Sequence, residues 1–262
     1  MVSERTAPAD GARTGRLSGR RAIVTGAARG IGAAIARALH REGAELALMD
    51  REEALCRATA AALGAHTVPV ELSDPASTRS ATAAAIEALG GVDILVNNAG
   101  ILRMAPLLDI SVDDWDLTFD INVRAMFVTT QAAARVMRDQ ELIGTRRGTI
   151  INMASMGGKV GSPNQAHYAA SKAAVIGLTR VTAMELGPHS IRANCICPGY
   201  VLTEMGAATR TPEMVAAWSS KSPLGRLAET TDVANMALFL ASDAASYCTG
   251  QAMNVSGGMV MH

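Results

Sequence analysis

The sequence predicts an α/β fold: one domain with a doubly wound parallel sheet and helices on both faces. Short apolar runs alternate with longer amphipathic segments along almost the whole chain, and turns with glycine or polar residues separate them. Regular alternation of strand and helix favours a parallel sheet covered on both sides. The length of 262 residues suits one such domain. We assign residues 17–262 to it and expect residues 1–16, which have little to bury, to form a mobile tail.

The first half of the chain alternates most regularly. Strands are predicted at 21–25, 45–50, 66–72 and 92–98, each short and rich in Val, Ile or Leu. A helix at 33–43 ends at Gly43, and a second covers 51–63. A third begins at Asp74-Pro75, because proline is favoured at the first helical position.

The second half has longer helices. They are predicted at 111–140, 167–187 and 230–242, with strands at 148–155, 191–198 and 251–258. Ser111 is a suitable N-cap for the first of these helices. Asn122 is a poor helix-interior residue, so it indicates a backbone defect, a bound water or an asparagine tolerated on the helix face. Residues 199–222 are predicted to be irregular.

Composition narrows the functional classes. The 24 basic and 24 acidic residues cancel, which argues against a general nucleic-acid binder. No apolar run reaches the ~20 residues of a membrane span, and the N-terminus lacks the apolar core of a signal peptide. We therefore expect a cytoplasmic protein without a membrane segment. No metal site or disulfide is predicted, and buried thiols are expected instead for Cys56, Cys195, Cys197 and Cys248.

The turn after the first strand, TGAARGIG, is rich in glycine. Gly26 permits a tight turn, Gly30 lets a diphosphate approach the backbone, and Gly32 lets helix and strand pack closely. The helix N-terminus that follows offers free N–H groups to an anion. The spacing is G-x-x-x-G-x-G, and its place after the first strand predicts a dinucleotide site.

Asp50 ends the second predicted strand, 18 residues after Gly32. A carboxylate near this distance accepts hydrogen bonds from the adenosine ribose and repels a 2′-phosphate, which favours NAD over NADP. Arg29 and Arg51 favour the opposite choice, since either can pair with a phosphate. Asp50 can also cap the helix that follows it, whether the cofactor is NAD or NADP.

Tyr168 and Lys172 are four residues apart, so they share one face of a helix. A phenol ordinarily loses its proton near pH ~10, and a neighbouring ammonium lowers that pKa. Ser155, upstream of both, can hold a substrate oxygen. The stretches at 97–100 (NNAG) and 198–203 (PGYVLT) lie at the carboxyl ends of predicted strands, where ligands of such sheets bind.

These motifs, in the order in which they occur, resemble those of the short-chain dehydrogenase/reductase family. The resemblance extends from Arg20 to the C-terminus, and the family has a Rossmann-like fold. The resemblance implies a catalytic tetrad of Asn122, Ser155, Tyr168 and Lys172 and a homotetrameric assembly. The cofactor contacts it implies are Gly26, Arg29, Gly30, Ile31, Gly32, Asp50, Arg51, Glu71, Leu72, Asn98, Ala99, Gly100, Tyr168, Lys172, Pro198, Gly199, Val201 and Thr203. Two positions depart from the family pattern. Glu71 stands where aspartate often meets the adenine, and Ser256 replaces a common aspartate, which we expect to affect assembly or C-terminal packing.

The expected reaction is hydride transfer between NAD(H) and a secondary alcohol or ketone. Tyr168 is the expected acid or base, Ser155 orients the substrate oxygen, and Lys172 also holds the nicotinamide ribose. Asn122 is expected to hold a water that passes the proton towards solvent. Substrate contacts are predicted for Ser155, Gly157, Gln165 and Tyr168, within loops 101–106, 156–165 and 199–220. These loops resemble those of NAD-linked polyol and diol dehydrogenases, which favours a small polyol, diol or related alcohol. His167 is expected to be exposed.

Two alternatives are open at this point. The RGIG turn with Arg29 suggests an NADPH-dependent reductase of 3-oxoacyl thioesters. A non-catalytic nucleotide-sensing module is the other, and the intact Ser155, Tyr168 and Lys172 argue against it. The chain has no G-x-S-x-G elbow, so a hydrolase of that kind is excluded.

Overall fold

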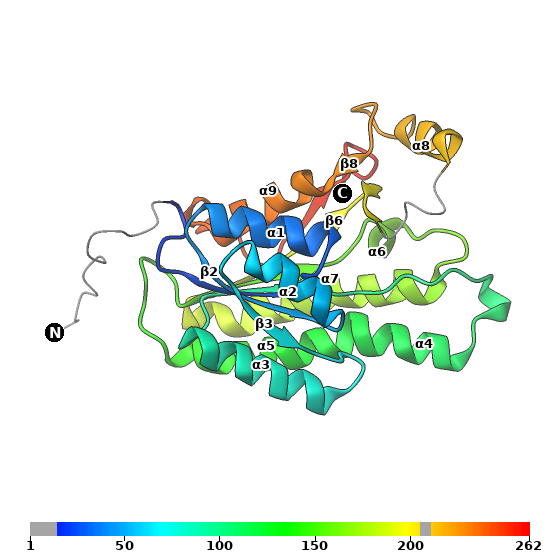
Figure 1. Cartoon of the computed structure of the whole chain (residues 1–262). Helices are drawn as coiled ribbons and strands as arrows, with labels where there is room; N and C mark the ends of the chain where they lie inside the picture. Colours follow the sequence, from blue (N-terminus) through cyan, green and yellow to red (C-terminus); the bar gives the residue numbers. More distant parts are fainter. Residues whose placement is uncertain (1–14, 205–210) are drawn as a thin grey trace.

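The computed structural model describes residues 15–204 and 211–262. Its centre is a sheet in the order β3-β2-β1-β4-β5-β6-β9, with parallel neighbours throughout (Figure 1). The strands are β1 (Arg21–Thr25), β2 (Glu45–Asp50), β3 (His66–Pro69), β4 (Ile94–Asn97), β5 (Gly148–Met153), β6 (Ile191–Pro198) and β9 (Ala252–Val255). The chain winds outward from β1 in one direction and from β4 in the other, which confirms the doubly wound sheet. The carboxyl ends of β1 and β4 meet where the winding reverses, the usual place for a ligand.

Helices cover both faces of the sheet. The main ones are α1 (Gly30–Arg41), α2 (Glu53–Ala61), α3 (Pro75–Leu89), α4 (Val112–Phe119), α5 (Ala125–Asp139), α7 (Ala166–Leu186) and α9 (Thr230–Ala241). α1 packs against α9 on one face, and α3 packs against α5 on the other, where α7 also lies (Figure 1). Each face therefore has its own apolar layer between helices and sheet.

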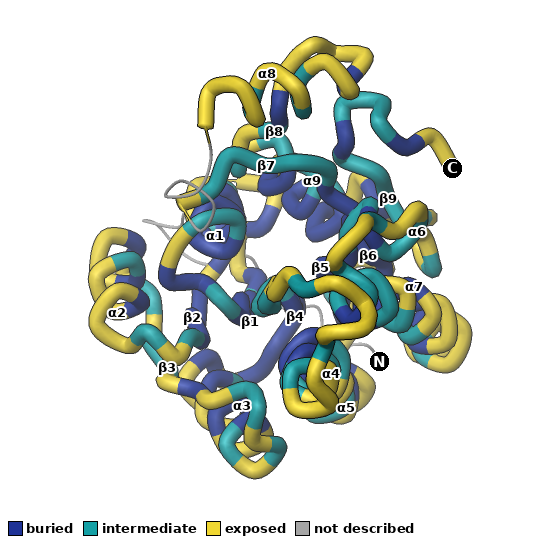
Figure 2. Tube along the Cα trace, turned by 90° about the vertical axis from the view of Figure 1, so that its right-hand side faces the viewer, coloured by how far each residue is buried: buried dark blue, intermediate teal, exposed yellow. Residues whose placement is uncertain are grey.

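The strands are buried because both of their faces are covered. β4, β5 and β6 are buried along their whole length. Figure 2 shows the central strands in dark blue, for buried, and the outward sides of the surrounding helices in yellow, for exposed. Side chains such as Ile23 and Leu95 are fully buried, and each contributes about 1.5–3 kcal/mol relative to an exposed position. This rigid layer fixes the strand ends that carry the site.

The long helix predicted at 111–140 is interrupted. α4 ends at Phe119, a π-turn covers Asp120–Arg124, and α5 continues from Ala125. Asn122 lies in this wider turn and is fully buried, so the predicted backbone defect is confirmed. Ser111 caps α4 through its side chain, which accepts a hydrogen bond from the Asp114 N–H at 3.0 Å.

The prediction of an irregular segment at 199–222 is wrong in part. It contains the short strand β7 (Val201–Leu202), which pairs with β8 (Ala228–Glu229), and the helix α8 (Pro212–Ser219). The helix begins as the sequence allows, with a Thr211 side chain that caps it and a proline at its first position. β3 is also shorter than predicted, since it ends at Pro69. Residues 205–210 of the segment lie outside the described residues.

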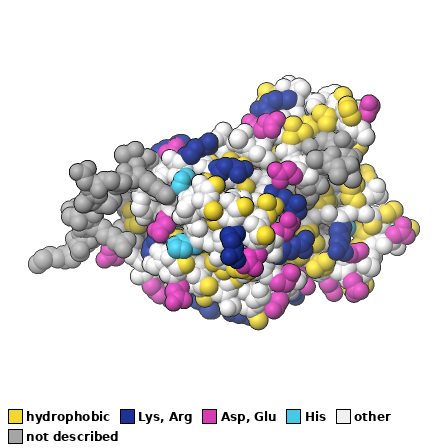
Figure 3. Space-filling model, in the orientation of Figure 1, with side chains coloured by type: hydrophobic (Ala, Val, Ile, Leu, Met, Phe, Trp, Pro, Cys, Tyr) yellow, Lys and Arg dark blue, Asp and Glu magenta, His cyan; other side chains and the backbone are white. Residues whose placement is uncertain are grey.

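The surface carries both signs of charge. Figure 3 shows basic and acidic side chains interspersed over the visible face, with hydrophobic side chains gathered near α8.

No helix in the described ranges is long and apolar enough to cross a membrane. Residues 1–14 of the predicted tail lie outside the described residues, while Arg16 pairs with Glu42 at 2.8 Å.

Candidate active site

The glycine turn between β1 and α1 has almost no free space. A Cβ on Gly32 would lie 2.1 Å from the Gly26 carbonyl oxygen, and one on Gly26 would lie 2.8 Å from Ala99 Cα. Gly26 also has a φ of +64°, which side chains rarely adopt. The Asn98 amide donates to the carbonyls of Thr25 and Gly26, both at 3.0 Å. The NNAG stretch therefore braces the turn, as expected of a backbone surface that a dinucleotide approaches closely.

Other predicted cofactor residues surround this turn. Leu72 lies beside Asn97 and Ala99 in the structure. A Cβ on Gly30 would lie 3.9 Å from the Thr203 methyl group, so the loop after β6 faces the start of α1. Pro198 and Gly199 connect that loop to the sheet, because the Pro198 carbonyl accepts from Met156 at 3.0 Å and Gly199 donates to Val255 at 2.9 Å. Val201 is in β7.

Asp50 is fixed at the end of β2. One carboxylate oxygen accepts from the Ala28 N–H and the other from the Glu52 N–H, both at 3.0 Å. Arg29 is the N-cap residue of α1, but its side chain makes no capping hydrogen bond and its guanidinium pairs with Glu52 at 2.6 Å. The sequence reasoning missed Glu52, although an acidic residue close behind Asp50 is a visible signal. One of the two arginines that favoured a 2′-phosphate thus already has a carboxylate partner.

Glu71 is engaged with its own loop. Its carboxylate accepts from the Ser73 N–H at 3.0 Å and from the Ser73 hydroxyl at 2.8 Å, and these bonds hold the pKa of Glu71 below its ordinary value. Arg51 adds a weaker electrostatic contribution in the same direction. The backbone of Glu71 is engaged as well, since its N–H donates to the Ser77 hydroxyl at 3.1 Å and its carbonyl accepts from the Asp74 N–H at 3.3 Å.

Ser155 and Tyr168 lie together at the carboxyl end of β5. The Ser155 hydroxyl is hydrogen-bonded to the Tyr168 phenol and accepts from the Gly157 N–H at 3.0 Å. A Cβ on Gly157 would lie 3.4 Å from Ser155 Oγ and 3.6 Å from Tyr168 Cε1. Gly157 thus leaves open the space between the serine and the tyrosine ring, where a substrate oxygen can enter.

Lys172 and Asn122 meet at Gly100. A Cβ on Gly100 would lie 3.2 Å from Lys172 Nζ and 3.0 Å from Asn122 Oδ1. The buried Lys172 ammonium donates to the Met153 carbonyl at 2.8 Å and lies 5.7 Å from the centre of the Tyr168 ring. The structure therefore brings the four predicted catalytic residues, from β5, the π-turn and α7, to one place beside NNAG.

Asn122 is held by a network of its own. Its amide oxygen accepts from the Ile101 N–H at 2.8 Å, and its amide nitrogen donates to the Ile101 carbonyl and the Ser171 hydroxyl, both at 3.0 Å. Ser171 in turn donates to the Tyr168 carbonyl at 2.7 Å. The π-turn is thereby tied to the helix that carries Tyr168 and Lys172.

The expected lowering of the Tyr168 pKa is not found in the protein alone. Burial raises the pKa of Tyr168 above its ordinary value, and the hydrogen bond with Ser155 opposes this only in part. Burial also lowers the pKa of Lys172 to about 8. The Lys172 ammonium donates to the Met153 carbonyl instead, and desolvation of the phenol is the largest influence on the pKa of Tyr168. The lowering expected with a cofactor bound stays a prediction.

His167 was expected to be exposed, and this is wrong. It is 1% exposed, and neither ring nitrogen has a hydrogen-bond partner within the described part of the chain. α7 packs against α4, the π-turn and the short helix α6 (Gly157–Val160), so it is covered on more than one side. Gln165, a predicted substrate contact, is the N-cap residue of α7 and is half-buried.

Two of the three predicted substrate loops, 101–106 and 156–165, meet in the structure. Ala105 donates to the Asn164 carbonyl at 3.0 Å, which joins the loop after β4 to the loop before α7. Trp218 of α8 stacks on Tyr200, with ring centres 4.8 Å apart and planes 8° apart. This stack attaches α8, which buries none of its residues, to the loop after β6.

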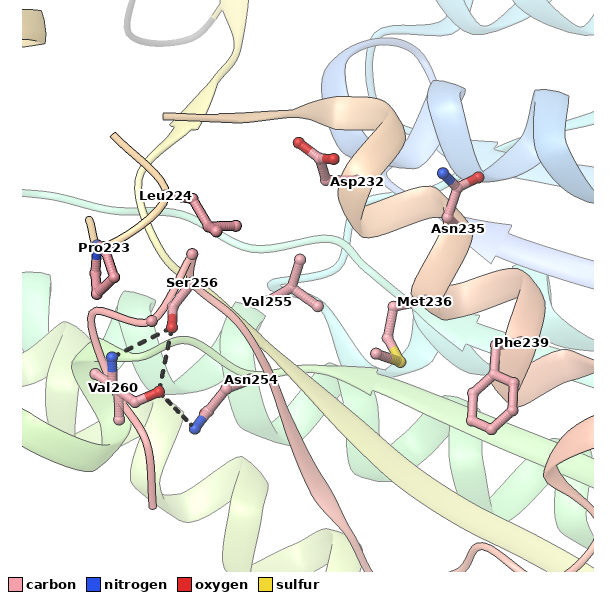
Figure 4. Close-up of a pocket in the computed structure, with 12 residues that line it drawn as sticks. Pro223, Leu224, Asp232, Asn235, Met236, Phe239, Asn254, Val255, Ser256 and Val260 are labelled. Carbon is pink, nitrogen blue, oxygen red and sulfur yellow. Dashed lines mark hydrogen bonds between the residues drawn. The ribbon is translucent and has the colours of Figure 1, made fainter. Parts of the chain in front are cut away.

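A separate cavity of about 670 Å³ lies between β9, α9 and the chain after α8 (Figure 4). It contains none of the predicted catalytic or cofactor residues. One wall is the C-terminal turn, where the Ser256 hydroxyl accepts from the Val260 N–H at 3.2 Å. Ser256 therefore acts in C-terminal packing, one of the two roles that we expected for it.

The fold and this residue set define a class: oxidoreductases that bind a nicotinamide dinucleotide at the carboxyl end of a parallel sheet. The model of the family described as enoyl-(acyl carrier protein) reductase matches residues 26–260. The chain belongs to the short-chain dehydrogenase/reductase family, whose members bind a nicotinamide cofactor, and it acts on secondary alcohols or ketones.

Its relatives have different substrates in their names. The chain is 39% identical to the L-xylulose reductase of Bos taurus, over 94% of this chain and 98% of the relative. It is 39% identical to a 3-alpha-(or 20-beta)-hydroxysteroid dehydrogenase of Mycobacterium bovis, over 94% and 92%. A short-chain type dehydrogenase/reductase from Mycobacterium marinum has a similar structure, with a TM-score of 0.86, 38% identity and coverage of 94% and 97%.

Proposed function

We propose that the protein interconverts a secondary alcohol and its ketone through Asn122, Ser155, Tyr168 and Lys172. The observation that carries this proposal is their convergence at Gly100 and Gly157, next to the glycine turn. Tyr168 exchanges the proton with the substrate oxygen as general acid or base, and Ser155 hydrogen-bonds the same oxygen. A bound nicotinamide supplies or accepts the hydride.

The remaining two residues act on Tyr168 and its proton. Lys172, with a pKa of about 8, exchanges a proton near neutral pH and contacts the cofactor ribose. Asn122 holds the π-turn in place and positions a water on the path from Lys172 to solvent. The raised pKa of Tyr168 in the protein alone suits an acid that donates its proton to a ketone, and a cation bound nearby would lower it for the reverse reaction.

For the cofactor we propose NAD. Asp50 presents a fixed carboxylate beside the glycine turn, and the Arg29 guanidinium pairs with Glu52, so a 2′-phosphate would meet negative charge. The backbone around Gly26 and Gly32 fits the close approach of a diphosphate. The residues proposed to contact the cofactor are those named above from the sequence.

For the substrate we propose a small polyol, diol or related alcohol, in contact with Ser155, Gly157, Gln165 and Tyr168. The similarity to a reductase named for xylulose, a sugar ketone, supports this choice.

A homotetramer and a cytoplasmic location are further proposals, which rest on the resemblance to the family. The second candidate, an NADPH-dependent 3-oxoacyl thioester reductase, is supported by Arg29 in the glycine turn.

A panel of secondary alcohols, polyols and ketones tests the proposal, with each substrate assayed with NAD(H) and with NADP(H). We expect turnover of a polyol or diol with NAD, read as absorbance of the reduced cofactor. Tyr168→Phe should lower turnover by at least about 100-fold, because a general acid or base contributes typically 10²–10⁴-fold. NADH binding by fluorescence should be unchanged. Substantial turnover by Tyr168→Phe would contradict the role of the phenol, and a preference for NADPH and a 3-oxoacyl thioester would select the second candidate.

A further inference from the structure

At the amino end of the sheet, opposite the candidate active site, three arginines bury their guanidinium groups. Arg20 precedes β1, Arg146 precedes β5, and Arg192 is near the start of β6, at 5%, 3% and 7% exposed. The carboxylate that they face belongs to Asp243, directly after α9, whose side chain is 61% exposed. We call these four residues the arginine cluster.

One oxygen of Asp243 serves two of these cations. Asp243 Oδ1 lies 3.1 Å from Arg146 Nη1 and 3.7 Å from Arg20 Nη2. The attraction of Asp243 also reaches Arg192, whose own hydrogen bonds go to the carbonyls of Leu240, Ser242 and Cys248. Three positive charges therefore share one carboxylate.

The other carboxylate near the cluster is already bound elsewhere. Asp93 attracts Arg146 more weakly than Asp243 does. Both of its oxygens accept hydrogen bonds from Arg21, from Nε and Nη2, each at 2.9 Å. The surplus positive charge of the cluster is therefore not balanced by Asp93.

The cluster also has unused hydrogen-bond donors. Within residues 15–204 and 211–262, Arg146 Nη1, Arg146 Nη2 and Arg192 Nε are buried without an acceptor, since the 3.1 Å contact to Asp243 lacks hydrogen-bond alignment. Burial and the neighbouring Arg20 lower the pKa of Arg146 to about 10, so it is still charged at neutral pH. A buried charged donor without a partner is costly, and an oxyanion satisfies both the charge and the donors.

We propose that the arginine cluster is a binding site for a small oxyanion such as phosphate, which takes the position that Asp243 Oδ1 occupies. The planar guanidinium fork matches the oxygens of phosphate or carboxylate. Asp243 is mostly exposed, so its side chain can turn outward into water and open access to Arg146 and Arg20. The site lies at the opposite end of the strands from the glycine turn, and this proposal is independent of the proposed reaction.

The test is calorimetric titration of inorganic phosphate into the full-length protein saturated with NADH, against chloride at equal ionic strength. The wild-type protein should bind one phosphate. Arg146→Gln should weaken binding at least tenfold. Its matched control is Arg147→Gln, since Arg147 is the next residue and donates to the Gln140 and His189 carbonyls instead, and it should bind within twofold of wild type.

Asp243→Asn should change phosphate affinity in the opposite direction from Arg146→Gln. Removal of the competing carboxylate should tighten phosphate binding at least threefold, and phosphate should raise the thermal midpoint of this variant more than that of the wild type. Asp139→Asn is its control, because Asp139 is an exposed aspartate paired with Arg138. If Arg146→Gln does not fold, Arg146→Lys, which keeps the charge but loses the fork, should still weaken binding.

Two results would overturn the proposal. One is phosphate binding no stronger than chloride in both the wild type and Asp243→Asn. The other is an equal loss of binding in Arg147→Gln and Arg146→Gln, which would show a general charge effect. Either result would leave the four residues as an ionic brace between β1, β5, β6 and α9.

Discussion

The two ends of the sheet both bury cations, but they use different side chains. At the carboxyl end, Lys172 has one carbonyl partner and a pKa of about 8. At the amino end, Arg146 is equally buried, yet its pKa is about 10. The same desolvation therefore turns a lysine into a group that exchanges protons near neutral pH, while a guanidinium stays charged and attracts an anion.

Gly32→Ala should have the largest effect at the carboxyl end. The added methyl group would lie 2.1 Å from the Gly26 carbonyl oxygen and 2.6 Å from the Asn98 amide nitrogen, so the turn must move. We expect loss of about 1–3 kcal/mol of stability and at least about 100-fold weaker NADH binding, measured by denaturation and fluorescence titration. Gly177→Ala is the control, since no atom lies within 4 Å of its added methyl group and the change should stabilise α7. Equal NADH affinity in the two variants would contradict the assignment of the turn.

Lys172→Met tests the lysine side of this comparison, through the dependence of stability on pH. Because the pKa of Lys172 is about 8 in the folded protein and near 10.5 when unfolded, the unfolded chain binds more protons between these values. The stability of the wild type relative to Lys172→Met should therefore be lowest below pH 8 and rise by about 3 kcal/mol by pH 10.5. Urea denaturation of both proteins across this range measures it. A constant difference would mean that Lys172 is not desolvated in the folded state.

Glu52→Gln should have the smallest effect, because Arg29 and Glu52 are partly exposed at 43% and 37%. Such a pair contributes about 0–1 kcal/mol, so release of Arg29 should raise the NADPH-to-NADH ratio of kcat/KM by no more than about fivefold. Glu53→Gln removes the same charge from the neighbouring residue, which pairs with Arg57, and should leave the ratio unchanged. An equal rise in both variants would show a general charge effect instead of a specific role of Arg29.

Much of this molecule could be predicted from sequence because the relevant signals are local. The glycine turn, Asp50 and the Tyr168–Lys172 spacing each lie within one turn, strand end or helix, so their geometry follows from chain periodicity. The topology then brings them together at the carboxyl edge. The four catalytic assignments and the cofactor contacts are still predictions for experiment to test.

Other features could not be predicted because they depend on residues distant in the chain. Arg20, Arg146, Arg192 and Asp243 come from four separate segments and meet only in the folded protein. The burial of His167 depends on the packing of α7 against other helices, which forms only in the folded protein. The direction of the Tyr168 pKa shift likewise depends on where the Lys172 ammonium points, which spacing alone does not determine.

Helix α8 lies within the predicted substrate loop 199–220, and its sequence can change at little cost in stability. None of its side chains is buried, and the stack of Trp218 on Tyr200 attaches it to the loop after β6. Replacements on a surface helix usually change stability by less than about 0.5 kcal/mol, far less than changes in the apolar layers beside the sheet. Selection can therefore vary most positions of this helix, and if loop 199–220 contacts the substrate as predicted, a library of residues 212–219 that keeps Trp218 is the economical starting point for redesign of specificity.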